Sequence, residues 1–172
     1  DGDGDGDGDG DGDGDGDGDG DGDGDGDGDG DDPCVQLTIE NLMPASNADH
    51  IVVAELVGGI GSPKMDIIQV ELWDSELGNH NLAIDPNDDY ATCTQCVRAF
   101  QDVDGQEASK AYYQQSGMLH LEDVDFLQHK FSVGAIADII HVESTFDEDL
   151  HSQPVQDGTC IRLVGKEDWN TL

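Results

Sequence analysis

The chain opens with a strict two-residue repeat that bars its first thirty residues from any hydrophobic core. Asp and Gly alternate from Asp1 to Gly30, and Asp31 and Asp32 extend the run to 17 carboxylates. A segment of low hydrophobicity and high net charge cannot bury apolar surface, and glycine adds to the entropy that ordering would cost. One interpretation of the tract is therefore a solvated, self-repelling linker.

An extended conformation gives the same repeat a second interpretation. Because side chains alternate between the faces of a strand, every Asp would lie on one face and every Gly on the other. Neighbouring carboxylates would stand roughly 7 Å apart, and the glycine face would let another backbone approach closely. Fixing the backbone of such a tract costs on the order of 30–60 kcal/mol. Only cations between the carboxylates and hydrogen bonds to sister strands could offset that cost.

Calcium is the cation that this tract favours, because calcium takes six to eight oxygen ligands whereas magnesium demands a tighter octahedron. Asp1, Asp3, Asp5 and Gly6 match the first half of an EF-hand loop, but Gly12 stands where that loop needs its bidentate acidic residue. The predicted calcium ligands of the tract are its carboxylates, Asp1, Asp3, Asp5, Asp7, Asp9, Asp11, Asp13, Asp15, Asp17, Asp19, Asp21, Asp23, Asp25, Asp27, Asp29, Asp31 and Asp32.

The composition changes after Pro33, so we predict an extended repeat over residues 1–33 and one domain over residues 34–172. Of the 41 acidic residues, 17 lie in the tract and 24 follow it, against six basic residues that all follow it. The second segment therefore carries a net charge of about −18. Such acidity disfavours nucleic acid as a partner. No apolar run is long enough to cross a membrane, and the sequence leaves open a lipid anchor upstream of Asp1.

Four cysteines form an even set. Cys34 opens the second segment and Cys160 precedes its last apolar run, so a bridge between them would join the two ends of the domain. Cys93 and Cys96 could close a tight local disulfide. We favour these two disulfides and hence an oxidising, extracellular or cell-surface location. A single bridge with a reduced pair, and a metal site, remain alternatives.

The pattern of the second segment is typical of an all-β domain. Short runs of alternating or apolar residues are separated by turn residues such as Asp104-Gly105 and Asp157-Gly158. The predicted strands are 35–39, 51–57, 68–72, 96–103, 112–121, 131–142 and 160–164. Residues 107–115 could instead form a short helix, although strand is favoured. We predict an antiparallel β-sandwich of seven or eight strands.

Three stretches of this segment carry a resemblance. They are Tyr113-x-x-Ser116-Gly117-x-Leu119, Phe131-Ser132-Val133 and Ser152-x-Pro154-Val155-x-Asp157-Gly158-x-Cys160-Ile161. Together with the repeat, they resemble uncharacterised secreted or surface proteins of myxobacteria-like bacteria, in which an acidic Asp/Gly-rich linker precedes a β-rich domain. The resemblance implies a surface location and a β-domain, and it supplies no catalytic residues.

Acidic turns are the candidate sites of the domain, because loops between strands can place several carboxylate oxygens on one cation. Asp102, Asp104 and Glu107 flank Gly105 and are the predicted calcium ligands outside the repeat. Two further acidic runs, residues 85–89 and 147–149, are weaker candidates. The sequence contains no motif of a hydrolase, a metalloprotease or a nucleotide-binding protein, and we predict that the protein is not an enzyme.

These features predict an extracellular structural subunit of a fibre or surface appendage. In that hypothesis the Asp-Gly tracts self-associate into a homo-oligomer or filament through calcium bridging and backbone pairing, and the β-domain is displayed outside. The alternative is a surface-anchored, adhesin-like or lectin-like binding module on a flexible acidic stalk.

Overall fold

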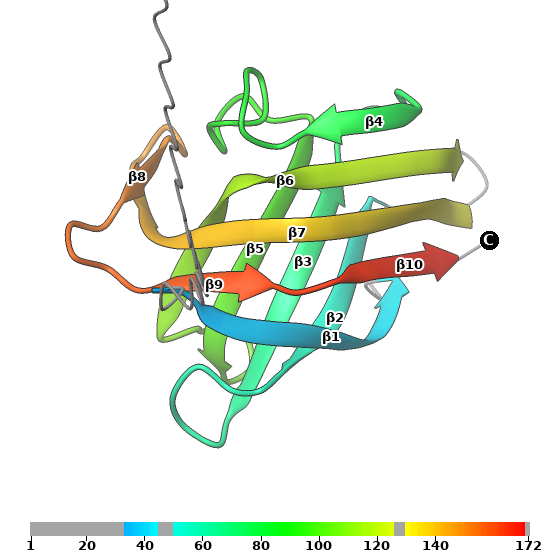
Figure 1. Cartoon of the computed structure of the whole chain (residues 1–172). Helices are drawn as coiled ribbons and strands as arrows, with labels where there is room; N and C mark the ends of the chain where they lie inside the picture. Colours follow the sequence, from blue (N-terminus) through cyan, green and yellow to red (C-terminus); the bar gives the residue numbers. More distant parts are fainter. Residues whose placement is uncertain (1–32, 45–49, 126–129, 171–172) are drawn as a thin grey trace, which may run out of the picture. The chain divides into compact units, whose positions relative to one another are not determined.

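The computed structural model describes residues 33–44, 50–125 and 130–170 (Figure 1). The predicted Asp-Gly repeat lies outside the described residues, apart from Pro33, so its extended conformation stays a prediction. The described residues form ten strands and no helix. The strands are β1 (Val35–Pro44), β2 (Ile51–Val57), β3 (Met65–Leu72), β4 (Gly78–Asn81), β5 (Gln95–Val103), β6 (Lys110–Asp125), β7 (Lys130–Phe146), β8 (Ser152–Pro154), β9 (Cys160–Leu163) and β10 (Lys166–Asn170).

Seven of the strands close into a barrel. Their order around the ring is β7-β9-β1-β2-β3-β5-β6, and β6 pairs with β7 to complete it (Figure 1). The β1–β9 pair is parallel and the other pairs of the ring are antiparallel. The all-β class predicted from the sequence is therefore confirmed. The predicted antiparallel sandwich differs from the structure, which is a closed ring with one parallel pair.

The two longest strands provide the closure. β6 and β7 pair along most of their length, and the register shifts four times between Gln114 and Asp125. Such bulges bend a strand and increase its twist, which lets a sheet curl until its edges meet. Gly117 lies at one shift with φ of +129°, and a Cβ there would stand 2.8 Å from the Cα of Ile139. The bend at this position therefore requires glycine.

The barrel interior is an aliphatic core built by the predicted alternation. On β3, for example, Ile68, Val70 and Leu72 are buried in the core while Ile67 and Gln69 are partly exposed, and Glu71 is buried by its ion pair with Arg98. Each fully buried aliphatic side chain contributes about 1.5–3 kcal/mol. Each of the seven predicted runs overlaps one strand of the ring, and residues 110–115 belong to β6, so the helical alternative for that stretch is wrong.

Three further strands extend the ring. β4 pairs with the far part of β6, and β10 follows β9 along the same edge of β7 (Figure 1). β8 pairs with the C-terminal end of β7. The predicted runs include none of these three. β4 and β8 contain no alternating apolar residues, and the described side chains of β10 include only one buried apolar residue, Trp169.

Both predicted disulfides are present. Cys34–Cys160 joins residues 126 positions apart with a Cα–Cα distance of 4.6 Å, next to the parallel β1–β9 pair. Cys93–Cys96 closes a local loop with a Cα–Cα distance of 5.6 Å. Neither bridge leaves a free cysteine among the described residues, so the reduced-pair and metal alternatives are excluded there. The two bridges indicate an oxidising compartment.

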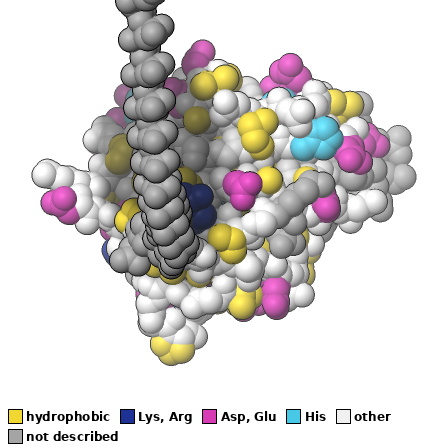
Figure 2. All heavy atoms as spheres, in the orientation of Figure 1, with side chains coloured by type: hydrophobic (Ala, Val, Ile, Leu, Met, Phe, Trp, Pro, Cys, Tyr) yellow, Lys and Arg dark blue, Asp and Glu magenta, His cyan; other side chains and the backbone are white. Residues whose placement is uncertain are grey.

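Acidic side chains are spread over the face of the domain that bears β7, β9 and β10, with little Lys or Arg among them (Figure 2). Among the residues that the structure describes, there is no helix long and apolar enough to cross a membrane.

Candidate functional site

The predicted acidic turn lies between β5 and β6, where the chain reverses tightly. The amide of Asp104 donates to the carbonyl of Glu107 at 2.9 Å, and the amide of Glu107 donates back at 3.2 Å. Gly105, inside this reversal, has φ of +69°, which glycine adopts without a steric penalty. The turn brings Asp102, Asp104 and Glu107 to the rim of one hollow.

That hollow has a volume of about 310 Å³ and a mixed lining. Its lining residues are Ser62, Lys64, Asp102, Asp104, Glu107, Ala108 and Ser109. The segment before β3 is held against the turn by a buried carboxylate. Asp66, which is 2% exposed, accepts hydrogen bonds from the amides of Ile60 and Asp102, each at 2.8 Å. The arrangement fixes the position of the rim.

Two carboxylates of the turn, Asp102 and Asp104, already have partners from the protein. Asp102 accepts hydrogen bonds from the hydroxyls of Ser62 and Ser109. Both bonds lower the pKa of Asp102, and the bond from Ser62 has the larger effect. Asp104 forms an ion pair with Lys64 at 3.3 Å, and both side chains are exposed. A cation entering the hollow would compete with Lys64. No three His, Cys, Asp or Glu side chains of the described residues are grouped closely enough to hold a metal. Calcium binding by Asp102, Asp104 and Glu107 therefore stays a prediction.

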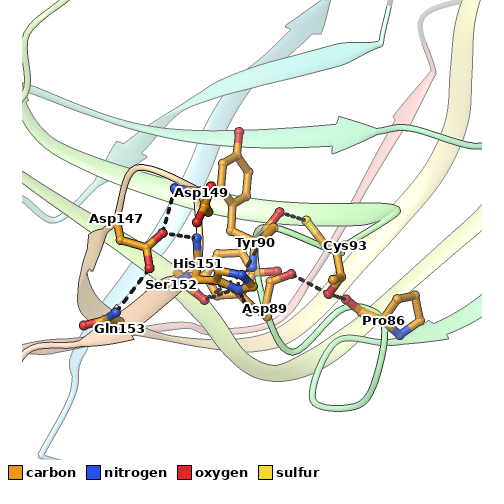
Figure 3. Close-up of polar contacts among 12 residues, drawn as sticks. Pro86, Asp89, Tyr90, Cys93, Asp147, Asp149, His151, Ser152 and Gln153 are labelled. Atoms are coloured by element: carbon orange, nitrogen blue, oxygen red, sulfur yellow. Dashed lines mark hydrogen bonds and ion pairs between the residues drawn. The ribbon is translucent and has the colours of Figure 1, made fainter.

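Asp89, from the first of the two weaker candidates, contacts the residues that follow the second, which the sequence did not indicate. Asp89, from the long segment between β4 and β5, accepts hydrogen bonds from the amide of Ser152 at 2.8 Å and from its hydroxyl at 3.1 Å. The other carboxylate oxygen of Asp89 lies 2.5 Å from Nδ1 of His151. Asp147 accepts from the amides of Asp149 and His151, which folds the turn after β7 (Figure 3). We refer to the contacts of Asp89 with His151 and Ser152 as the Asp89 clamp.

The clamp shifts the pKa of both charged partners. Burial alone would raise the pKa of Asp89, but hydrogen bonds from His151 and Ser152 outweigh it and lower that pKa to about 2. The hydrogen bond to Asp89 and its charge raise the pKa of His151 above its ordinary value. In mildly acidic solution, Asp89 is therefore negatively charged and His151 is positively charged.

Serine, histidine and aspartate lie together in this clamp without the order of a catalytic triad. A triad needs the serine hydroxyl to donate to the imidazole. Here the Ser152 hydroxyl donates to Asp89 and accepts from the amide of Tyr90 at 3.3 Å. Among the described contacts, the imidazole of His151 has no bond to that hydroxyl. The geometry is that of a link between two segments.

Beneath the clamp lies a small second core on the outside of the barrel, which we call the outer cluster. Tyr113, Cys93 and Cys96 are buried in it, with Tyr90 and Phe146 packed against them. The rings of Tyr90 and Phe146 meet edge to face with centroids 5.2 Å apart. The local disulfide thus closes the same segment that Asp89 holds at the surface.

A buried ion pair completes the outer cluster. Nε of Arg98 lies 2.7 Å from Oε1 of Glu71, a side chain that is 1% exposed. The Tyr90 hydroxyl donates to the other oxygen of Glu71 at 3.1 Å, and the guanidinium lies 4.1 Å from the Tyr90 ring centroid. Burial, with the charge of Glu71, raises the pKa of Tyr90 to about 12. These residues could not be recognised as a group in the sequence, because nothing in their spacing links them.

Comparison of the chain with protein-family models, with curated proteins and with solved structures found no match. The resemblance to secreted myxobacterial proteins with acidic linkers therefore remains an expectation from the quoted residues.

Proposed function

We propose that this protein is an extracellular or cell-surface structural subunit whose Asp-Gly tract binds calcium and associates with the tracts of other copies. The barrel domain would be displayed outside the association. The observation that carries the proposal is the composition of the tract, which holds 17 carboxylates and no apolar side chain. Two disulfides support the extracytoplasmic location, where calcium is abundant and disulfides persist.

Calcium fits the tract because association of like-charged chains needs neutralisation. Divalent ions between carboxylates of neighbouring copies would replace repulsion with bridging, and the glycine face would let backbones pair. Full neutralisation of the tract would take about eight or nine divalent ions per chain.

Sedimentation velocity of the full chain tests the proposal. We expect a monomer in EDTA, large species in millimolar calcium, and a return to monomer when EDTA is added again. The matched control replaces every Asp of residues 1–32 with Asn, which preserves length and glycine content while removing the charge. Association of this control with calcium, or large species of the wild type that persist in EDTA, would refute the proposal.

A second function, a binding module on an acidic spacer, is favoured by one observation on the barrel. An apolar hollow with two half-exposed methionines, Met43 and Met65, lies on the outer face of β1, β2 and β3. Exposed methionines of this kind adapt to varied partners. If the tract is only a spacer, a Gly-Ser tract of equal length would preserve partner binding, whereas it would abolish a tract-based assembly.

A further inference from the structure

The apolar hollow on β1, β2 and β3 has a volume of about 360 Å³, and its exposed lining is almost entirely apolar. It is lined by Asn41, Met43, Val53, Ala54, Glu55, Met65 and Ile67. The Met43 side chain is 52% exposed and the Met65 side chain is 54% exposed, so neither methionine belongs to the buried barrel interior. Large apolar side chains gathered on one exposed face are typical of an interaction surface.

A β-bulge places Met43 on this face. Glu40 of β1 pairs with Glu55 of β2, but three residues later Met43 pairs with Val53, so β1 carries one extra residue. Asn41, inside the bulge, has φ of +56°, a conformation that asparagine tolerates better than most residues. Without the extra residue, Met43 would point to the opposite face from Glu40. The bulge therefore brings a methionine and a carboxylate to the same side.

Two glutamates face each other at the hollow: Glu55, which lines it, and Glu40 on the neighbouring strand. Glu40 and Glu55 are directly opposed on neighbouring antiparallel strands, and both are exposed. Opposed residues have Cβ atoms about 4.5–5.5 Å apart, and like charges at such positions destabilise the sheet. Within the described part of the chain neither carboxylate has a hydrogen bond or an ion pair. A cation between them would remove the repulsion.

We propose that this face binds a segment of a partner protein in which a Lys or Arg adjoins an aliphatic or aromatic residue. The cation would lie between Glu40 and Glu55, and its apolar neighbour would enter the hollow beside Met43 and Met65. Charge favours such a partner over a second copy of this chain, since the segment after Pro33 carries about −18. The proposal rests on the binding-module function and is independent of calcium association by the tract.

Fluorescence anisotropy with the full chain tests the proposal in EDTA at physiological salt. The probe is a fluorescein-labelled peptide, Gly-Lys-Leu-Lys-Phe-Lys-Ser-Gly, and the comparison peptides replace either Lys with Glu or Leu and Phe with Ser. We expect the first peptide alone to bind. Glu40→Gln with Glu55→Gln should weaken binding about fivefold. Met43→Thr with Met65→Thr should weaken it about tenfold.

Two matched controls exclude attraction by the general negative charge. Asp123→Asn with Glu148→Gln removes two exposed charges elsewhere and should leave binding unchanged. The chain with Asn at every tract Asp should also bind as the wild type does. Equal binding by the hollow variants, or loss of binding only in the Asn-Gly chain, would overturn the proposal. It would likewise fall if the wild type self-associated in EDTA and the methionine variant did not, because the occupant would then be a second copy.

Discussion

The barrel interior and the outer cluster are two cores of opposite character in one domain. The interior is mostly aliphatic and is built from residues that alternate along strands, such as Ile68 and Val70. The outer cluster combines aromatic rings, a disulfide and a buried ion pair, Glu71–Arg98. The barrel interior is stabilised by the apolar area that it removes from water, and this effect does not depend on the orientation of the groups. The outer cluster depends on the geometry of its paired polar groups. The difference predicts that the two regions respond differently to substitution and to pH.

Removal of the two disulfides, one at a time, should give the largest difference in the free energy of unfolding. Constraint of the unfolded chain grows with loop length, so Cys34→Ala with Cys160→Ala should lower the free energy of unfolding by about 5 kcal/mol. Cys93→Ala with Cys96→Ala should lower it by about 2 kcal/mol, because that bridge closes only a short loop. Urea unfolding followed by circular dichroism measures both. Equal losses would show that the local bridge supports far more than its own loop.

Breaking the buried ion pair should rank second. Arg98→Ala leaves the carboxylate of Glu71, which is 1% exposed, without its cation and should cost about 3–5 kcal/mol. The matched double variant, Glu71→Leu with Arg98→Met, removes both charges and should stay within about 1 kcal/mol of the wild type. If the double variant lost as much as the single one, packing of the guanidinium against Tyr90 would be the dominant contribution.

Two histidines should give the regions opposite pH dependence. His141 is fully buried in the barrel, and neither ring nitrogen has a hydrogen-bond partner among the described residues. Burial lowers its pKa to about 3, so its unfolded form binds a proton first and stability falls as pH drops from about 6.5, by at most about 1.4 kcal/mol per pH unit. The raised pKa of His151 in the Asp89 clamp gives the reverse, since that contribution is complete below pH 6.5 and is lost as pH rises through the folded pKa.

Unfolding of His141→Leu and His151→Gln across pH 4 to 8 measures this contrast. His141→Leu should flatten the loss of stability on the acid side and should raise stability by about 1–3 kcal/mol, because it removes an unpartnered imidazole. His151→Gln should flatten only the loss above neutral pH, and its effect should be the smaller of the two. His120→Leu, at a half-exposed position on β6 where the imidazole contacts Asn79 and Glu122, serves as the comparison for a surface histidine. Equal pH profiles for the two variants would contradict the assignment.

The same contrast explains what the sequence could predict. Alternating or continuous apolar runs marked all seven barrel strands, because a strand with a buried face needs apolar residues there. No such run marks β4 or β8, because these short strands consist of polar residues, glycine and proline. They pair with β6 and β7, respectively. Closure of the ring depends on bulges in β6 and β7, and a bulge has no reliable pattern in one sequence. The number and spacing of the runs therefore could not distinguish the predicted sandwich from a closed barrel.

For the candidate sites as well, the sequence indicates groups of neighbouring residues but not contacts between distant segments. The acidic turn at Asp102 was predicted because its residues are near neighbours in the sequence. Lys64, which lines the same hollow, lies 40 residues before its partner Asp104, and no local pattern links the two. The meeting of Asp89 with His151 joins residues 62 positions apart. Contacts of this kind arise from the topology, so only the folded chain reveals them.

The parallel pairing of β1 with β9 has a consequence for folding of the protein. The ring joins its first strand to a strand more than a hundred residues later, and the Cys34–Cys160 bridge crosses the same seam. A chain in which β9 has not yet paired would leave an edge of β1 and part of one edge of β7 without a partner strand. Such edges recruit other strands and aggregate, and long-range closure is slow. Pairing of β9 is therefore the step that covers both edges at once.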